Sequence, residues 1–207
     1  MPSSRRNWYA LFEALSVFAM IQLYIWRLRF PYPYSWTIIL ALMLASHAFR
    51  RETPASLGFG RKNLSNLLAV FTPFVLVLSL GLLAIGSVFR TIRHVTPESG
   101  FSSLLLYFAW GLFQQYILNG YFVNRFKEVS LAYSPLLAGT LFSAVHTPNW
   151  FLMLVTLAGG YVCARVYLKY RNLYFLGLAH GAVGFLLYLV VPDTISHHLY
   201  VGPKWFS

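Results

Sequence analysis

The sequence predicts an all-α, polytopic integral membrane helix bundle with about seven transmembrane helices. Of its 207 residues, 58% are hydrophobic and only 10% are charged, whereas an ordinary soluble domain is roughly 25% charged. The apolar residues form long runs, and a helix needs about 20 such residues to cross a bilayer. The composition does not shift along the chain, so a single transmembrane domain over residues 1–207 accounts for its length.

Seven apolar segments can be drawn along the chain. They are residues 8–26, 36–49, 67–89, 101–123, 131–146, 150–168 and 173–191. The second and fifth are short for a span, so we expect them to be little tilted or flanked by snorkelling side chains. Pro148 predicts that the fifth helix ends near His146 and that the sixth begins at Pro148 or Asn149.

The charge is strongly basic, with 16 Lys and Arg against 5 Asp and Glu and a formal net charge of +11. The basic residues lie between apolar runs and not together on a soluble module, so the sequence predicts no nucleic-acid partner. Eleven of them fall on one side of the predicted bundle: Arg5, Arg6, Arg50, Arg51, Arg61, Lys62, Arg125, Lys127, Arg165, Lys169 and Arg171. Five fall on the other: Arg27, Arg29, Arg90, Arg93 and Lys204. The positive-inside rule therefore predicts a cytoplasmic N-terminus, and we expect a plasma-membrane protein surrounded by lipid.

Three side-chain amides interrupt the apolar fourth segment. Gln114 and Gln115 project about 100° apart on a helix, and Asn119 lies one turn beyond Gln115. An amide without partners in hydrocarbon costs several kcal/mol, so these amides should face other helices. Hydrogen bonds between helices would explain the row by themselves. Polar groups at this depth are also candidates for a functional site.

Two histidines lie in the later apolar segments. His146 comes four residues after Phe142, and His180 is inside the last segment. A lone intramembrane histidine is as often a packing residue as a site residue, but two that can pack beside the amides favour a site. The other histidines lie near helix ends or in loops, where we expect them to be solvated or interfacial: His47, His94, His197 and His198.

This pattern resembles the CAAX prenyl protease and bacteriocin-processing (CPBP) family of intramembrane peptidases. The family's motifs are Glu-Glu-x-x-x-Arg, then Phe-x-x-x-His, then His-x-x-x-Asn or Asp. Phe142 to His146 matches the second motif. The third motif keeps its first residue as His180, with Gly184 in place of Asn or Asp.

The first motif departs from the family pattern. Gln114 and Gln115 stand where the family has two glutamates, and Asn119 stands in place of the arginine. The order and spacing of the motifs and the upstream segment 57–59 fit, and the resemblance covers about residues 102–189. Because the acidic and basic groups are lost together, no buried ion is left unpaired. An amide can orient a water molecule, but it cannot take its proton near neutral pH.

The resemblance implies an intramembrane endopeptidase acting on a membrane-embedded or lipidated peptide or protein. The residues that it makes catalytic are Gln114, Gln115, His146 and His180, and those that it makes binding residues are Asn119, Phe142, Gly184 and Trp110. A second interpretation stays open because the usual glutamates are absent: a non-catalytic relative that binds a peptide, a lipid or a membrane-protein partner in the same cavity. A transporter-like bundle ranks last, because the sequence has no paired broken helices or repeat symmetry.

The sequence predicts no metal ligand set. Zinc prefers three or four His, Cys, Asp or Glu ligands, and only His146 and His180 are near the predicted site, so we assign no cofactor; a divalent metal such as zinc would be poorly liganded. We expect Glu13, the one carboxylate in a predicted span, to snorkel toward the membrane surface. It would supply charge to the site only if the first helix packed against the fourth. We expect Cys163, the single cysteine, to be a packing residue.

Overall fold

The computed structural model describes residues 3–61 and 63–207, and every regular element in those two ranges is helical. Lys62 and the side chains of Arg5 and Arg6, which entered the predicted charge count, lie outside the described residues. The elements are α1 (Ser3–Leu23), η1 (Tyr24–Leu28), α2 (Trp36–Phe49), α3 (Leu64–Val88), α4 (Pro97–Gln115), η2 (Tyr116–Val123), α5 (Asn124–Val129), α6 (Ser134–Ala144), α7 (Trp150–Tyr170), α8 (Leu173–Val190), α9 (Asp193–Ser196), η3 (His197–Leu199) and η4 (Gly202–Phe206). The predicted all-α class is confirmed.

Four helices in the described part of the chain are long and apolar enough to cross a membrane: Asn7–Leu28, Leu64–Val88, Trp150–Tyr170 and Leu173–Val190. α2 and α6 are apolar but shorter. Another long helical body runs from α4 through η2 into α5 without a break. Each of the seven predicted apolar segments is therefore helical, and the protein is an integral membrane helix bundle.

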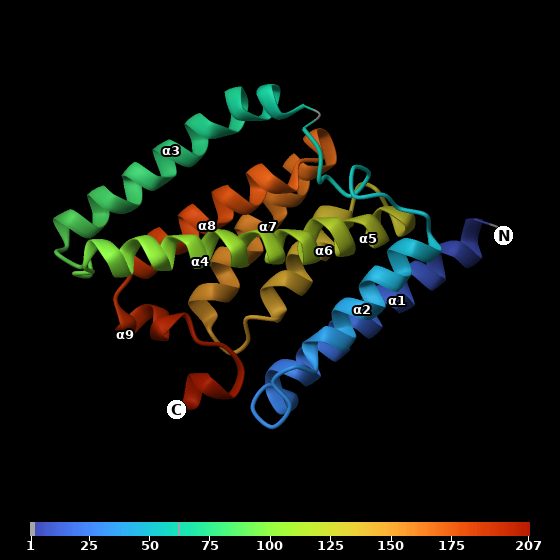
Figure 1. Cartoon of the computed structure of the whole chain (residues 1–207), viewed down its shortest axis with the longest axis horizontal. Helices are drawn as coiled ribbons and strands as arrows, with labels where there is room; N and C mark the ends of the chain where they lie inside the picture. The colour runs from blue at the N-terminus through green and yellow to red at the C-terminus, as the bar shows by residue number, and fades with distance from the viewer. Residues whose placement is uncertain (1–2, 62) are drawn as a thin grey trace.

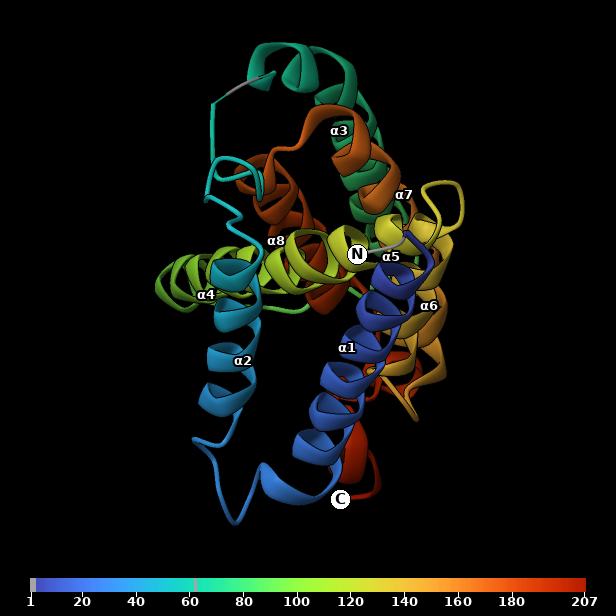
Figure 2. The same ribbon diagram turned by 90° about the vertical axis from the view of Figure 1, so that its right-hand side faces the viewer.

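The bundle is arranged around the α4–η2–α5 body, which crosses the whole molecule (Figure 1). α8 packs along α4, and α3 packs on α8. At the other end, α1 packs on α5, and α1 and α2 form a helical hairpin (Figure 2). α6 and α7 form a second hairpin, which also contacts η2. The polar residues of η2 are thus surrounded by helices and not by lipid.

Glycines bring α4 and α8 into backbone contact. A Cβ atom on Gly111 would lie 2.6 Å from the carbonyl oxygen of Gly177, and one on Gly181 would lie 2.7 Å from the carbonyl oxygen of Tyr107. No side chain fits at these distances, so the crossing requires glycine, as in other closely packed membrane helices. Gly177 and Gly181 therefore have a packing role at this crossing.

The turn between α6 and α7 lies where Pro148 predicted it. Asn149 caps α7, with its side-chain oxygen accepting from the Leu152 backbone N–H. Its side-chain nitrogen donates to the carbonyl oxygens of Ser196 and Tyr200, at 2.8 and 3.0 Å. One asparagine therefore starts α7 and also fixes the C-terminal segment against this turn.

Candidate functional site

A cavity of about 730 Å³ lies between α3, α4, α7, α8 and the C-terminal segment. Its wall is mostly apolar with a few polar groups, which is typical of ligand-binding pockets. Seven of the eight predicted site residues line it: Trp110, Gln114, Gln115, Phe142, His146, His180 and Gly184. The eighth, Asn119, is buried behind the wall. A second, open hollow of about 430 Å³ is formed by loop residues 31–38 and holds no histidine or amide side chain.

A chain of hydrogen bonds joins Asn119, Gln115 and His180. Asn119 Nδ2 donates to Gln115 Oε1, and Gln115 Nε2 lies 2.9 Å from His180 Nδ1. Because the Gln115 oxygen faces Asn119, its NH₂ group faces His180, and Nδ1 of that imidazole is the acceptor. A neutral imidazole that accepts at Nδ1 carries its proton on Nε2. His180 is therefore a hydrogen-bond donor toward the cavity through Nε2.

His146 has the opposite tautomer. Its Nδ1 lies 2.7 Å from the carbonyl oxygen of Phe142, four residues earlier. A carbonyl oxygen only accepts, so Nδ1 carries the proton and Nε2 keeps its lone pair. The Phe142 ring touches both imidazoles, with centroid separations of 5.1 Å to His146 and 5.9 Å to His180. The cavity wall thus presents one proton acceptor and one proton donor.

Other wall residues complete this surface. Gln114 is half-buried and has no hydrogen bond to another described residue, so its amide is free for a ligand. Cys163, expected only to pack, lines the cavity. A Cβ atom on Gly184 would lie 3.3 Å from the Tyr107 ring, so the family's Asn or Asp would meet that ring here.

Sequence reasoning missed Tyr107 and Cys163 as wall residues. Tyr107 could have been found, because Tyr107, Trp110 and Gln114 follow the i, i+3, i+7 spacing of one helix face. Cys163 could have been found in the same way, because Gly159, which also lines the cavity, lies one turn before it.

The helix that carries the amides is not a uniform α-helix. Gln115 ends α4, and Tyr116–Val123 is the π-helix η2, where the sequence predicted ordinary α geometry. Seven of its eight residues are buried, Asn119 among them. Wide turns of this kind are frequently found at functional sites in proteins. The contact between Asn119 and Gln115, predicted from one α-helical turn, is kept.

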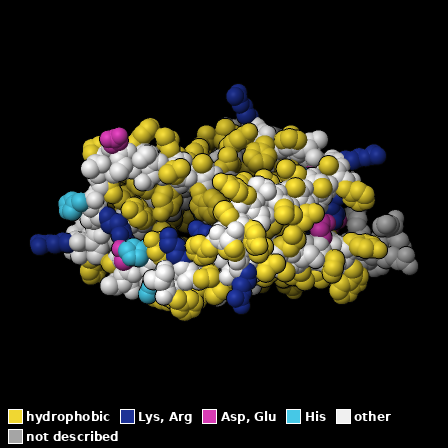
Figure 3. Space-filling view, turned by 60° about the horizontal axis from the view of Figure 1, so that its bottom comes forward, with side chains coloured by type: hydrophobic (Ala, Val, Ile, Leu, Met, Phe, Trp, Pro, Cys, Tyr) yellow, Lys and Arg dark blue, Asp and Glu magenta, His cyan; other side chains and the backbone are white. Residues whose placement is uncertain are grey.

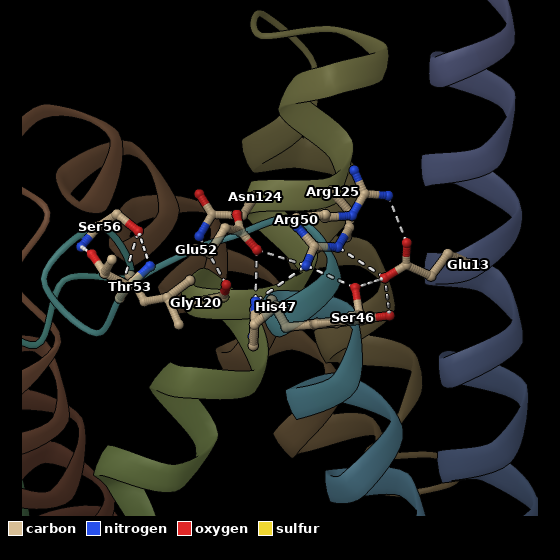
Figure 4. A network of polar contacts seen from close by, with 12 residues as sticks. Glu13, Ser46, His47, Arg50, Glu52, Thr53, Ser56, Gly120, Asn124 and Arg125 are labelled. Atoms are coloured by element: carbon tan, nitrogen blue, oxygen red, sulfur yellow. Dashed lines mark hydrogen bonds and ion pairs between the residues drawn. The ribbon is translucent and has the colours of Figure 1, made fainter. Parts of the chain in front are cut away.

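A second polar cluster, which we call the ion-pair cluster, lies where α1, α2 and α5 meet (Figure 4). Its members are Glu13, Ser46, His47, Arg50, Glu52, Tyr121, Arg125 and Glu128. Arg125 is fully buried and donates to Glu13 at 2.9 Å and to Glu52 at 2.8 Å. Arg50 joins Glu13 to Glu128, with both distances 2.6 Å. None of these carboxylates lines the cavity.

The ion-pair cluster corrects two expectations. His47 is not solvated but 4% exposed, and its Nδ1 lies 2.7 Å from Glu52. Glu13 is not simply snorkelling to the surface, because Arg50 and Arg125 hold it where α1 packs against α5. Burial raises the pKa of Glu52, but hydrogen bonds from His47 and Arg125 outweigh that effect and lower it to about 2. The carboxylates of the cluster are therefore paired with Arg50 and Arg125.

The side chains near the cavity do not form a metal-binding set. Across residues 3–61 and 63–207, no three His, Cys, Asp or Glu side chains come together in a way that could hold a metal ion. Zinc sites need at least three such ligands.

Together these features define a class: an integral membrane helix bundle with a polar, histidine-lined cavity. Residues 96–186 match the family model described as type II CAAX prenyl endopeptidase Rce1-like. This match supports membership of the CPBP family, which the motifs predicted. No curated protein and no solved structure matches the chain. The matched segment contains all eight predicted site residues.

Proposed function

We propose that the protein is an intramembrane endopeptidase that hydrolyses a membrane-embedded or lipidated peptide in the cavity. The single observation that carries this proposal is the pair of opposite tautomers, with an acceptor at His146 and a donor at His180. Hydrolysis of an amide needs a base for the attacking water and a donor for the developing oxyanion. The two imidazoles can supply both without the family's glutamates.

In the proposed reaction, His146 Nε2 takes a proton from water while the water oxygen bonds to the scissile carbonyl carbon. The carbonyl oxygen gains negative charge and is stabilised by the Nε2–H of His180. The C–N bond then breaks, and the imidazolium of His146 returns its proton to the leaving amine. Proton transfer of this kind contributes typically 10²–10⁴-fold to a rate.

The amides have positioning roles in this proposal. Gln115 holds His180 in the donating tautomer, because its NH₂ group faces Nδ1. Asn119 in turn fixes the orientation of Gln115. Gln114 has no partner among the described residues and lines the same cavity, so it is placed to orient the water or the substrate carbonyl.

The protein would act in the plasma membrane with its N-terminus in the cytoplasm, as the basic residues predict. Two observations agree with this topology. Arg50 and Arg125, both assigned to the inner side, share the ion-pair cluster. Arg29 and Lys204, both assigned to the outer side, line the same cavity. The cavity mouth would then face the outer leaflet.

The test is cleavage of lipidated and unmodified membrane peptides by the purified protein, with products identified by mass spectrometry. His146→Ala should lower the rate about 10²–10⁴-fold, because it removes the base. His94→Ala is the matched control, since His94 is an exposed loop histidine away from the cavity, and it should leave the rate unchanged.

Two outcomes of this experiment would contradict parts of the proposal. If the parent protein cleaves no peptide and the double variant Gln114→Glu, Gln115→Glu gains activity, the chain is a binding relative that lacks its base. Cleavage by the parent that survives in His146→Ala would contradict the assigned base and leave the endopeptidase activity standing.

A further inference from the structure

Two cationic side chains converge on one amide oxygen at the end of the bundle where α7 turns into α8. Lys127 Nζ lies 2.7 Å from Asn124 Oδ1, and Arg171 Nη2 lies 3.3 Å from the same oxygen. Asn124 and Arg171 are 47 positions apart, so the fold and not the local sequence brings these groups together. Two like charges at such a distance repel each other, and the oxygen of a neutral amide does not cancel them.

Neither cation has a carboxylate partner within 4.0 Å among the described residues. The chain has five Asp and Glu residues. Three of them belong to the ion-pair cluster, where they are paired with its two arginines. Glu98 is exposed in the first turn of α4, and Asp193 pairs with Arg93. With Lys127 and Arg171 added, four cations stand against three carboxylates at this end of the bundle, so positive charge is in excess.

The guanidinium group of Arg171 is held in place by the surrounding fold. Its Nη2 also donates to the Ser56 carbonyl oxygen, and its Cζ lies 5.3 Å from the centre of the Tyr167 ring. The backbone N–H of Leu173 donates to the Gly58 carbonyl at 2.9 Å, which fixes the loop with Ser56 against the start of α8. A cation that is already positioned loses little conformational freedom when an anion binds.

The pair of cations lies at the level of the lipid head groups. α7 and α8 are both long and apolar enough to cross a membrane, and only Arg171 and Asn172 lie between them. Tyr133 and Tyr174 have exposed side chains next to this turn and to the end of α5, which is typical of the membrane interface. Figure 3 shows one face of the molecule, on which apolar side chains form most of the surface and several Lys and Arg side chains project from its margins.

We propose that Lys127 and Arg171 bind the phosphate group of an anionic phospholipid at this membrane surface. Guanidinium and ammonium groups both bind phosphate through charge-assisted hydrogen bonds. Lys127 uses one of its three ammonium protons among the described residues, so others are available for the phosphate. A zwitterionic head group would bring its own ammonium group near the two cations, whereas an anionic head group adds no positive charge. This binding does not depend on the proposed peptide cleavage.

The lipid site is connected to the helix of the cavity wall through Asn124. Asn124 Nδ2 donates to the Gly120 carbonyl at 2.8 Å and to the Tyr167 hydroxyl at 3.0 Å. Gly120 belongs to η2, the helix that also carries Asn119. A phosphate that fixes the two cations around Asn124 therefore stabilises the packing of η2 against α7.

The experiment titrates the purified full-length protein in detergent with dioleoylphosphatidylglycerol or dioleoylphosphatidylcholine. Native mass spectrometry counts the bound lipids and gives the affinity for each. Because each basic residue near an anionic lipid contributes about a factor of five, the parent should bind one phosphatidylglycerol at least about tenfold more tightly than phosphatidylcholine. In Lys127→Gln combined with Arg171→Gln, this preference should fall to about twofold or less.

The matched control is Arg165→Gln combined with Lys169→Gln. Both residues are exposed on α7, and neither contacts Asn124, so this control removes the same charge from the same helix end and should keep the preference. Equal affinities of the parent for the two lipids would overturn the proposal. An equal loss in the control would also overturn it, and would assign the preference to the general positive charge of this surface.

Inorganic phosphate distinguishes a lipid from a soluble anion at the same site. Added at the concentration of the lipid, it should not displace phosphatidylglycerol, because it lacks the acyl chains that pack on the apolar surface. Displacement at equal concentration would assign the two cations to a soluble anion and overturn the choice of a lipid.

The single variant Lys127→Gln keeps the proposal testable if the double variant does not fold. Arg171 holds the loop with Ser56, whereas Lys127 has a single hydrogen bond among the described residues. Lys127→Gln should therefore keep the thermal unfolding midpoint of the lipid-free protein and lose about fivefold of the preference for phosphatidylglycerol. An unchanged preference in this variant would overturn a site built from two cations.

Discussion

The cavity wall and the ion-pair cluster are two polar regions on one continuous helical body, and they use polar groups in opposite ways. Gln115 contributes a neutral amide to a wall that faces an open cavity, and the buried Asn119 holds this amide from behind. Arg125, further along the same body, is fully buried between Glu13 and Glu52. The buried ion pairs lie where helices fill the space, and the neutral amides lie beside the cavity.

The difference follows from the cost of leaving polar groups without partners. A buried ion is tolerated only when its counter-ions and hydrogen bonds are permanently in place. A cavity that exchanges water, substrate and product cannot guarantee such partners. Neutral imidazoles and amides tolerate an empty cavity at a lower cost, because an unpaired neutral group costs less than an unpaired charge. The loss of the family's glutamates and arginine fits this division.

The strongest way to break the comparison is to remove the central cation of the ion-pair cluster. Arg125→Met keeps the length of the side chain but leaves Glu13 and Glu52 without their shared partner. Breaking a buried ion pair in this way costs about 3–5 kcal/mol of stability. We expect a large drop in the thermal unfolding midpoint of the protein in detergent. Tryptophan fluorescence during heating measures this midpoint.

Arg165→Met is the control for that change. Arg165 is exposed on α7 and has no ion pair among the described residues, so its substitution should change stability by less than about 0.5 kcal/mol. A small and equal effect for both variants would mean that the ion-pair cluster is only a solvated surface network, and the contrast between the two regions would be lost.

A smaller effect is expected when the amide chain of the cavity wall is broken. Gln115→Leu leaves Asn119 Nδ2 and His180 Nδ1 without partners. An unsatisfied buried group costs about 1–3 kcal/mol, so we expect about 2 kcal/mol of destabilisation. Loss of the fixed His180 tautomer should also lower the rate of peptide cleavage about 10²-fold, as for an oxyanion donor. Thermal unfolding and cleavage assays on the same preparation measure both effects.

The Gln114→Leu variant distinguishes the role of Gln114 from that of Gln115. Gln114 has no hydrogen bond to another described residue, so its loss should leave stability within about 0.5 kcal/mol of the parent while lowering cleavage. If Gln114→Leu destabilises the protein as much as Gln115→Leu, the two glutamines do not differ in the way that the hydrogen-bond chain requires.

The cavity was far more predictable from the sequence than the ion-pair cluster. Gln114 and Gln115 could be found because amides are conspicuous in an apolar run, and His146 and His180 because the motif spacing connects them. The tautomers of the two histidines could not be predicted, because they depend on the partners of Nδ1 in the folded chain. The π-helix was missed for a similar reason: wide turns have no periodicity signal of their own, and α geometry is the default expectation.

The ion-pair cluster could not be predicted because its residues are distant in sequence. Glu13 and Arg125 are 112 positions apart, and Arg125 was assigned to a basic loop by its neighbours in the chain. His47 looked interfacial because it lies near the end of α2. Only the packing of α1 against α5 brings these groups together. The chain has only five acidic residues. Their basic partners are neighbours in space and not in sequence, so the ion pairs could not be predicted from sequence spacing.

A further expected effect is the pH dependence of the ion-pair cluster. The pKa of Glu52 is lowered from 4.5 to about 2, because hydrogen bonds from His47 and Arg125 outweigh the effect of burial. The unfolded chain binds this proton near pH 4.5 and the folded chain only near pH 2, so stability falls as the pH drops through that window. After allowance for partial exposure and for the Arg125 shared with Glu13, the loss of stability from Glu52 is about 1–2 kcal/mol.

Glu52→Gln should be less stable than the parent at pH 7, and its stability should change less between pH 4.5 and pH 2.5, whereas Glu98→Gln should follow the parent. Parallel curves for Glu52→Gln and the parent would mean that Arg125 does not hold this carboxylate in its charged form.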